Sequence, residues 1–229
     1  DVMDFITSKT QAGKITNANI SVGISDDFMQ AVKDDADWEM VFPDVADERY
    51  QTDWDGDLQK WKEKGGKVIV YKTEKARTIW NKIIECAWKS AEPGVFFMDR
   101  YNKMSNSWYS ARIFCTNPCG EQGLPAWGVC NLGHINLSKF ADVTAHSVKW
   151  EDLKETVTRA MRFQDNVIDA TPYFFEQNKI QQMSERRVGM GTIGLAELLI
   201  RLGIRYGSNE SMQFIDKLYK FIAEEAYMA

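Results

Sequence analysis

The apolar residues of this chain recur with two different periods, one typical of strands and one typical of helices. Segments with the one period alternate along the sequence with segments that have the other. Residues 19–24 alternate between apolar and polar side chains and are rich in β-branched residues, which is typical of a strand. Residues 74–91 place apolar side chains every three to four positions, which predicts a helix with one buried face. Strands that alternate with helices predict an α/β fold.

The same two patterns extend over most of the chain. They predict further strands at 38–42, 67–72, 94–100 and 186–194, and helices at 2–9, 26–35, 150–170, 195–203 and 209–228. Residues 10–17 are predicted to form a loop. Residues 43–66 are charged and turn-rich, with weak periodicity, so we expect a surface excursion there. Its aromatic residues are expected to pin it to the surface: Tyr50, Trp54 and Trp61.

Composition and charge narrow the class of protein. The net charge of −5 provides neither the basic surplus nor the basic stripe that nucleic-acid binding requires, so no such partner is expected. An apolar run of about 18 residues is missing, so no membrane span is expected, and the first residues lack the pattern of a signal peptide. The four cysteines are too sparse for a disulfide scaffold, which indicates a reducing, cytoplasmic location: Cys86, Cys115, Cys119 and Cys130. Cys86 lies beside a helical apolar stripe and is expected in the core.

Three glycines have the spacing of a dinucleotide-binding turn: Gly189, Gly191 and Gly194. That fingerprint also requires a second strand that ends in an acidic residue about 20 residues later. Here the corresponding stretch reads as the start of a helix. A tight strand-to-helix turn is therefore the favoured interpretation, and dinucleotide binding is the weaker alternative.

Two interpretations compete for the cysteine-rich segment at 113–136. The first is a zinc site, because Cys115, Cys119, Cys130 and His134 have the ligand types of a closed tetrahedral centre. The segment between them also carries amide, carboxylate and indole groups, and structural zinc usually serves domains too small to hold a core. No metal is therefore our expectation.

The second interpretation is a redox and proton-transfer site. Asn117, Cys119 and Glu121 alternate in sequence, so in an extended loop tip they would face one pocket. Pro118 and Gly120 lie between them and would stiffen the tip. Cys130 follows 11 residues after Cys119. Two thiols near a carboxylate base can carry out redox and proton-transfer chemistry, whereas these residue types are not typical of a packed core. A turn with buried cysteines is an open alternative.

The order of several segments resembles the ribonucleotide reductase family. TNPCGE followed by CNLGHINL is similar to the family's finger loop and the strand after it. Further similar segments occur in the same order: DFITSK, NANISVGISDDFM, AWKSAEPGVFFMDRYN, RFQDNVID and RRVGMGTIGLAELL. The resemblance covers nearly the whole chain, and the NPCGE form is most similar to the adenosylcobalamin-dependent class. His134 departs from the pattern, since family members usually have Ser there.

The resemblance implies a fold and a mechanism. The chain would be the central part of a ten-stranded α/β barrel with the finger loop inside. Cys119 would hold a transient thiyl radical and abstract the 3′ hydrogen of the substrate ribose. Glu121 would take the proton of the 3′ hydroxyl, and Asn117 would hydrogen-bond the ribose hydroxyls. Cys130 would be one of two thiols that supply reducing equivalents and end as a disulfide.

The resemblance also implies cofactors and partners. Adenosylcobalamin would generate the radical, a ribonucleoside diphosphate or triphosphate would be the substrate, and a thioredoxin-like protein would be the reductant. The loop at 10–17 resembles the loop that senses a deoxynucleotide or ATP effector. Contacts to the effector and an ordinary loop role are both open for Lys14, Thr16 and Asn17.

Features of the family are missing from these 229 residues: the partner thiol of Cys130, the phosphate-binding loop and the C-terminal cysteine pair. We therefore expect the middle third of a reductase, with little or no turnover alone. A complementing subunit of a split reductase and a zinc-stabilised binding module are the alternative hypotheses. An exposed barrel edge would favour a homodimer.

Overall fold

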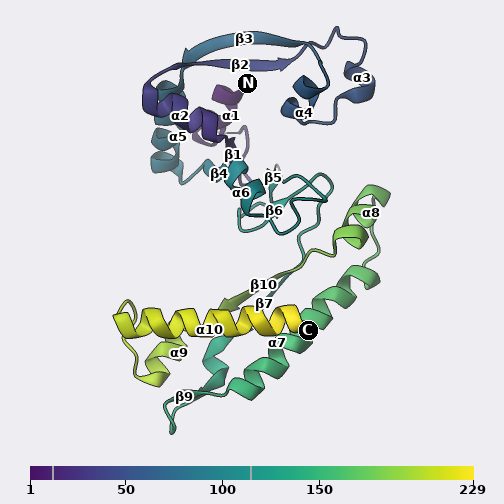
Figure 1. Cartoon of the computed structure of the whole chain (residues 1–229). Coiled ribbons are helices and arrows are strands. Elements are labelled where there is room, and N and C mark those ends of the chain that lie inside the picture. Colours follow the sequence, from purple (N-terminus) through teal and green to yellow (C-terminus); the bar gives the residue numbers. More distant parts are fainter. Residues whose placement is uncertain (12, 114) are drawn as a thin grey trace. The chain divides into compact units, whose positions relative to one another are not determined.

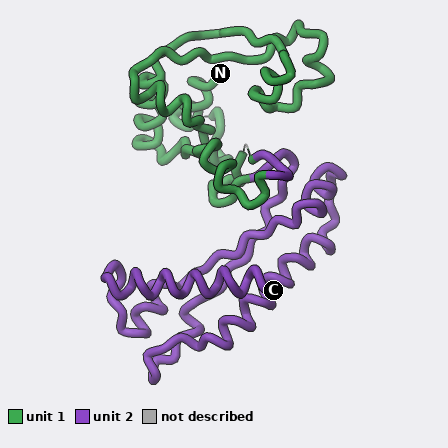
Figure 2. The backbone as a smooth tube through the Cα atoms, viewed as in Figure 1, with its two compact units in different colours: residues 1–108, 113–123 green, residues 109–112, 124–229 purple. Residues whose placement is uncertain are grey.

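The computed structural model describes residues 1–11, 13–113 and 115–229. Ala12, within the predicted loop 10–17, and Phe114, within the predicted segment 113–136, lie outside the described residues. The chain divides into two compact units, residues 1–108 with 113–123 and residues 109–112 with 124–229 (Figure 2). Each unit is described by itself.

The first unit begins with helical turns and ends with the cysteine-containing hairpin (Figure 1). Its helices are α1 (Val2–Thr7), η1 (Ser8–Thr10), α2 (Asp26–Asp34), α3 (Tyr50–Asp53), α4 (Leu58–Glu63), α5 (Ala76–Ser90) and α6 (Met98–Met104). Its strands are β1 (Ser21–Ile24), β2 (Asp37–Pro43), β3 (Val68–Lys75), β4 (Gly94–Phe97) and β5 (Cys115–Thr116). The strand β6 (Gly123–Leu124) lies at the division between the units.

The second unit is mostly helical and is organised around two long helices (Figure 1). Its helices are η2 (Leu137–Phe140), α7 (Trp150–Ala170), α8 (Glu176–Glu185), α9 (Leu195–Leu202) and α10 (Asn209–Met228). Its strands are β7 (Leu132–Asn136), β8 (Ala141–Asp142), β9 (Ser147–Val148) and β10 (Gly189–Ile193). Leu153 and Val157 of α7 and Leu218 of α10 are fully buried in one apolar cluster, as the helical spacing predicts.

The mixed α/β content is confirmed, and the sheets are small. β1 pairs with β4 and β7 pairs with β10, both in parallel, whereas β2 and β3 form an antiparallel hairpin. Within the residues that the structure describes, strands pair only in twos, so a closed ten-stranded barrel is not formed there. Over the same residues, no helix is both long and apolar enough to cross a membrane.

The core of the first unit joins β1 to α2 and α5. Ile24, Phe28 and Ile79 are buried there, and Cys86 is 1% exposed, so its prediction as a core residue is confirmed. Before β1, the main-chain N–H of Ile20 donates to Glu92 Oε1 at 2.9 Å. Glu92 also pairs with Lys9 at 2.9 Å, and these two partners hold the pKa of that carboxyl below its ordinary value.

The segment at 43–66 has more order than the sequence predicts. It contains α3 and α4, and Trp61, one of the aromatic residues expected to pin it, is only 2% exposed. The indole Nε1 of Trp61 donates to Lys67 O at 2.8 Å, and Arg49 lies 5.6 Å from the ring centroid. The rings of Tyr50 and Trp54 pack edge-on against Trp61, with centroids 6.3 and 6.1 Å away, and form a small aromatic core that weak periodicity in the sequence does not reveal.

Two other predictions differ from the structure. The predicted strand at 94–100 ends at Phe97, because residues 98–104 form α6. The helix α8 at 176–185 was not predicted, since its sequence has a weak apolar stripe and follows the aromatic pair Phe174 and Phe175. The glycine turn is as expected: β10 leads into α9 through Gly194, whose φ of +74° suits glycine.

Gln164 of α7 binds the main chain at the start of the parallel strand pair β7–β10. Its Nε2 donates to Gly189 O at 2.9 Å and to Asn131 O at 3.3 Å. Asn131 Nδ2 in turn donates to the main-chain oxygen of Gln164 at 2.9 Å. Gln164 is 3% exposed, so these bonds satisfy main-chain groups that water reaches poorly.

A second contact of α7 with the segment before β10 involves Asp165 and Asp169, one and five residues after Gln164. Arg186 forms ion pairs with Asp165 at 2.7 Å and with Asp169 at 3.0 Å. The pKa of Arg186 is raised and that of Asp165 is lowered, in each case chiefly by their shared hydrogen bond. The segments RFQDNVID and RRVGMGTIG are therefore in contact through both Gln164 and Arg186.

The hydrogen bonds of Gln164 predict that Gln164→Glu, which keeps the size of the side chain and removes its N–H donor, has a large effect on stability. At neutral pH a buried carboxylate would face the carbonyls of Gly189 and Asn131, so we expect a loss of about 3 kcal/mol in the free energy of unfolding. The loss should shrink at low pH, because the protonated carboxyl regains a donor. Urea unfolding at both pH values measures this, with the exposed Gln177→Glu of α8 as the control. Equal losses for the two variants would contradict it.

Candidate active site

The predicted site residues Asn117, Cys119 and Glu121 lie on one short hairpin of the first unit. β5 and β6 pair, and the six residues between them form a turn that main-chain hydrogen bonds close. Asn117 N donates to Gln122 O at 3.1 Å, and Gly120 N donates to Asn117 O at 3.0 Å. Gly120 has a φ of +83°, which a residue with a side chain rarely adopts.

This geometry corrects the prediction of an extended tip with three side chains on one face. Since residues 117–120 form a tight turn, alternate side chains do not point in the same direction. Asn117 is 6% exposed and points inward, whereas Cys119 and Glu121 are exposed. The turn therefore exposes the thiol and the carboxylate, whereas the oxygen of the Asn117 amide is engaged within the turn by Gln122.

Asn117 has a structural contact that sequence reasoning missed. Its Oδ1 accepts a hydrogen bond of 2.9 Å from the main-chain N–H of Gln122. Gln122 is itself buried, so without this acceptor its N–H would lose its partner. The side chain and the main chain of Asn117 thus close the turn together, and only the amide N–H group of Asn117 is left to act on a ligand.

The base of the hairpin is held by α6, which the sequence did not reveal as a helix. Asn102 Nδ2 donates to Ile113 O at 2.6 Å, and Ile113 N donates to Asn102 Oδ1 at 2.8 Å. Tyr101 packs against Gly123, where an added Cβ would come within 2.6 Å of the ring. Both residues belong to the segment DRYN, so the family resemblance was the one signal that could have found them.

Cys119 has a polar neighbour from a distant part of the sequence. Asn19 Nδ2 lies 3.9 Å from Cys119 Sγ, although the two residues are 100 positions apart. Asn19 comes directly before Ile20, whose position is fixed by Glu92. The predicted effector residues Lys14, Thr16 and Asn17 lie exposed in the loop that leads to Asn19.

Cys130, the other predicted catalytic thiol, belongs to the second unit. It is exposed and immediately precedes Asn131, which Gln164 holds. Gly133 lies close to the Gln164 amide, since an added Cβ would be 3.3 Å from Gln164 Cδ. The thiol therefore stands at the edge of a rigid, hydrogen-bonded strand start.

Cys115 and His134, the remaining candidate zinc ligands, lie in different environments. Partial burial raises the pKa of the Cys115 thiol, which disfavours the thiolate that a metal requires. His134 of β7 lies over Gly191 of β10, where an added Cβ would come within 2.8 Å of the imidazole. Among the residues described, no three His, Cys, Asp or Glu side chains are grouped so that they could hold a metal ion.

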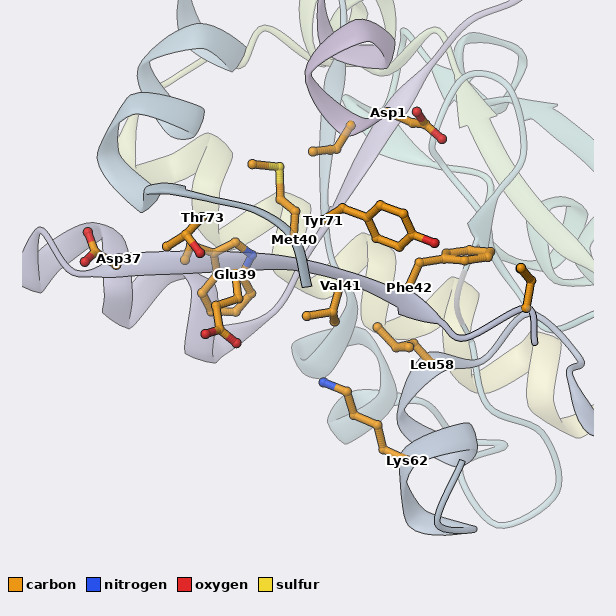
Figure 3. A pocket seen from close by; sticks show the side chains of 13 residues that line it. Asp1, Asp37, Glu39, Met40, Val41, Phe42, Leu58, Lys62, Tyr71 and Thr73 are labelled. Atoms are coloured by element: carbon orange, nitrogen blue, oxygen red, sulfur yellow. The ribbon is translucent and has the colours of Figure 1, made fainter. Parts of the chain in front are cut away.

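A hollow of about 1140 Å³ lies beside the β2–β3 hairpin (Figure 3). Its walls come from β2, β3, α4 and the beginning of α1, and they mix apolar side chains such as Phe42 and Tyr71 with Asp37 and Lys62. None of the predicted site residues lines it. The hairpin that carries Cys119 is therefore not part of this hollow.

Comparison with known proteins places this chain in a family. A family model of the ribonucleotide reductase barrel domain matches residues 1–229. The chain belongs to this family. It is 38% identical over 230 residues to a vitamin B12-dependent ribonucleoside-diphosphate reductase of Thermoplasma acidophilum, with 100% of this chain and 27% of the relative covered.

Other relatives carry related names. The chain is 32% identical over 230 residues to a vitamin B12-dependent ribonucleoside-diphosphate reductase of Mycobacterium tuberculosis, covering 100% of this chain and 30% of that protein. It is 29% identical over 242 residues to the ribonucleoside-diphosphate reductase subunit alpha of Chlamydia pneumoniae, covering 100% of this chain and 23% of that subunit. The chain thus spans less than a third of the length of these relatives.

The turn geometry predicts how Asn117 can be varied. Asn117→Ala removes the acceptor for the Gln122 N–H, so this buried amide should lose protection against hydrogen exchange, and the protein should lose about 1–3 kcal/mol of stability. Asn117→Asp keeps an acceptor at the same place and should retain the protection of Gln122. Hydrogen exchange resolved at Gln122 is the measurement, with Asn81→Ala on the exposed side of α5 as the control. Unchanged exchange in Asn117→Ala would show that the side chain does not close the turn.

Proposed function

We propose that this chain carries the radical chemistry by which a reductase converts ribonucleotides to deoxyribonucleotides, with Cys119 as the radical residue. The observation that supports this most is an exposed thiol at the tip of a turn closed by a buried amide, in a chain of the reductase family. Hydrogen-atom transfer requires close and reproducible approach of sulfur to carbon. A sulfur that is open to a ligand on a fixed main chain meets both conditions.

Vitamin B12 appears in the names of the two most similar relatives reported above, and adenosylcobalamin would supply the initiating radical here. The described residues fit that role at one point, because the Cys119 sulfur is exposed and its hydrogen can be removed. We assign no residue of this chain to hold the cofactor.

The residues around Cys119 take the acid–base roles. As a thiyl radical, Cys119 abstracts the 3′ hydrogen of the ribose and becomes a thiol, and the radical passes to C3′. The thiol returns this hydrogen to C3′ after the 2′ position is reduced, so that the thiyl radical is restored. Glu121, exposed two positions later, accepts the proton of the 3′ hydroxyl. Asn117 donates its remaining N–H group to the ribose hydroxyls, while its oxygen stays bound to Gln122.

Cys130 is one of two thiols that provide the electrons. The 2′ hydroxyl leaves as water, two electrons and two protons come from the thiol pair, and the pair ends as a disulfide. The exposed position of Cys130 next to the Asn131–Gln164 contact supports a thiol that is accessible yet fixed. A thioredoxin-like protein would reduce the disulfide again.

The wider assembly follows from the family. The parallel pairs β1–β4 and β7–β10 would be parts of a ten-stranded barrel that surrounds the thiol hairpin. The names of the relatives favour ribonucleoside diphosphates as substrates. Lys14, Thr16 and Asn17 would contact a deoxynucleotide or ATP effector, and the enzyme would act as a homodimer.

The roles of the two thiols are separable in a full-length reductase that contains this sequence. Cys119→Ser should abolish turnover and 3′ hydrogen exchange, because a hydroxyl is a far poorer radical carrier than a thiol. Cys130→Ser should spare exchange of the 3′ hydrogen and block product formation. Release of tritium from 3′-labelled substrate and the yield of deoxynucleotide measure the two steps.

The matched control is Cys86→Ala, which removes a thiol from the core of the first unit without touching the hairpin. It should retain both steps. Turnover that survives in Cys119→Ser and Cys130→Ser alike would refute the assignment of these two thiols as catalytic residues.

A further inference from the structure

We infer that Asn19 is a positioning residue for the Cys119 thiol: its side-chain amide donates a hydrogen bond to the sulfur and thereby fixes the direction of the S–H bond. The inference rests on the proposed function of Cys119. The contact itself is a property of the first unit alone, with Asn19 Nδ2 at 3.9 Å from Cys119 Sγ. This distance is within the range of hydrogen bonds to sulfur, which is a larger and weaker acceptor than oxygen.

Asn19 approaches the sulfur from a main chain that is held on its C-terminal side. Ile20 is buried, its N–H donates to Glu92 Oε1 at 2.9 Å, and its oxygen accepts from Gly94 N at 3.0 Å. Lys9 is paired with the other carboxylate oxygen of Glu92. Asn19, the residue before Ile20, therefore has a defined main-chain position, although its side chain is exposed.

The main chain around Cys119 is also held in place by hydrogen bonds. The hydrogen bonds of Asn117 with Gly120 and Gln122 close the turn in which it lies. The base of the hairpin is held by Asn102 through Ile113. Two separately anchored segments thus bring one amide and one thiol together, which is a stronger observation than two flexible side chains in contact.

The polarity of the contact determines its consequence. An amide nitrogen only donates, so the sulfur is the acceptor and its own hydrogen points elsewhere. With one lone pair engaged by Asn19, the S–H bond is directed away from the loop at 13–19 and toward the open side of the turn. This is the hydrogen that must be removed before the thiol can act on a substrate, so Asn19 sets the direction from which that removal takes place.

Asn19→Asp tests the polarity with nearly unchanged shape. A carboxylate accepts and does not donate, so it should draw the S–H hydrogen toward itself. Infrared difference spectra of this 229-residue chain report this directly, since the S–H stretching band of Cys119 is the one that disappears in Cys119→Ser. The band should move to lower frequency in Asn19→Asp, because S–H becomes a hydrogen-bond donor.

Asn81→Asp on the exposed side of α5 carries the same change of charge and should leave the band in place. Asn19→Ala should change the band to that of a thiol without the amide contact. A Cys119 band that is the same in wild type, Asn19→Asp and Asn19→Ala would overturn the inference.

The catalytic consequence is measured in a full-length reductase that contains this sequence. Loss of one hydrogen bond that orients a reacting group should lower kcat about threefold to tenfold and leave KM unchanged, in Asn19→Ala and more strongly in Asn19→Asp. A shifted infrared band with unchanged kcat in both variants would overturn the positioning role. Turnover that survives in Cys119→Ser would instead refute the proposed function, while the infrared result would still decide the contact.

Discussion

Short strands leave main-chain N–H and C=O groups that a longer sheet would pair, and in this chain side-chain amides meet that need. β5 and β6 have two residues each, and β7 and β10 have five. Asn117, Asn102 and Gln164 each bind the main chain beside one of these strands. A buried main-chain N–H or C=O group without a hydrogen-bond partner lowers the stability of the fold by about as much as several favourable contacts raise it. These side-chain amides therefore decide the local geometry.

This constraint links the fold to the chemistry. The amide of Asn117 faces inward because Gln122 needs an acceptor, and the same turn leaves the sulfur of Cys119 outside. In the second unit, the side-chain amide of Gln164 donates to Asn131 O, and Cys130 is the next residue toward the N-terminus. Both thiols are therefore accessible side chains on main chains that side-chain amides hold in place.

Sequence patterns predicted the features that depend on neighbouring residues. The helices at 150–170 and 209–228 were found because their apolar faces repeat regularly over five turns or more, and the strand β1 was found because its β-branched residues alternate. Cys119 and Cys130 were chosen as candidates because they lie in one segment with an amide and a carboxylate, and because that segment resembles the finger loop of the family. By contrast, α6 was missed because its first residues continue the apolar run of β4.

Long-range contacts could not be predicted in this way. Nothing near Asn19 in the sequence indicates that it lies beside Cys119, 100 residues later. Trp61 was expected to pin its segment to the surface, but the sequence did not indicate that its ring packs against Gly66 or that its N–H donates to Lys67 O. The turn at 117–122 was mistaken for an extended tip, because the acceptor role of Asn117 toward Gln122 has no sequence signature.

The central claim is that the Cys119 sulfur carries the radical. Electron paramagnetic resonance of a full-length reductase that contains this sequence, frozen during turnover, tests this most directly. Incorporation of cysteine deuterated at the β carbon should narrow the hyperfine structure of the protein radical, and Cys119→Ser should remove the signal. A radical signal that is insensitive to the deuterated cysteine, or that persists in Cys119→Ser, would contradict the account.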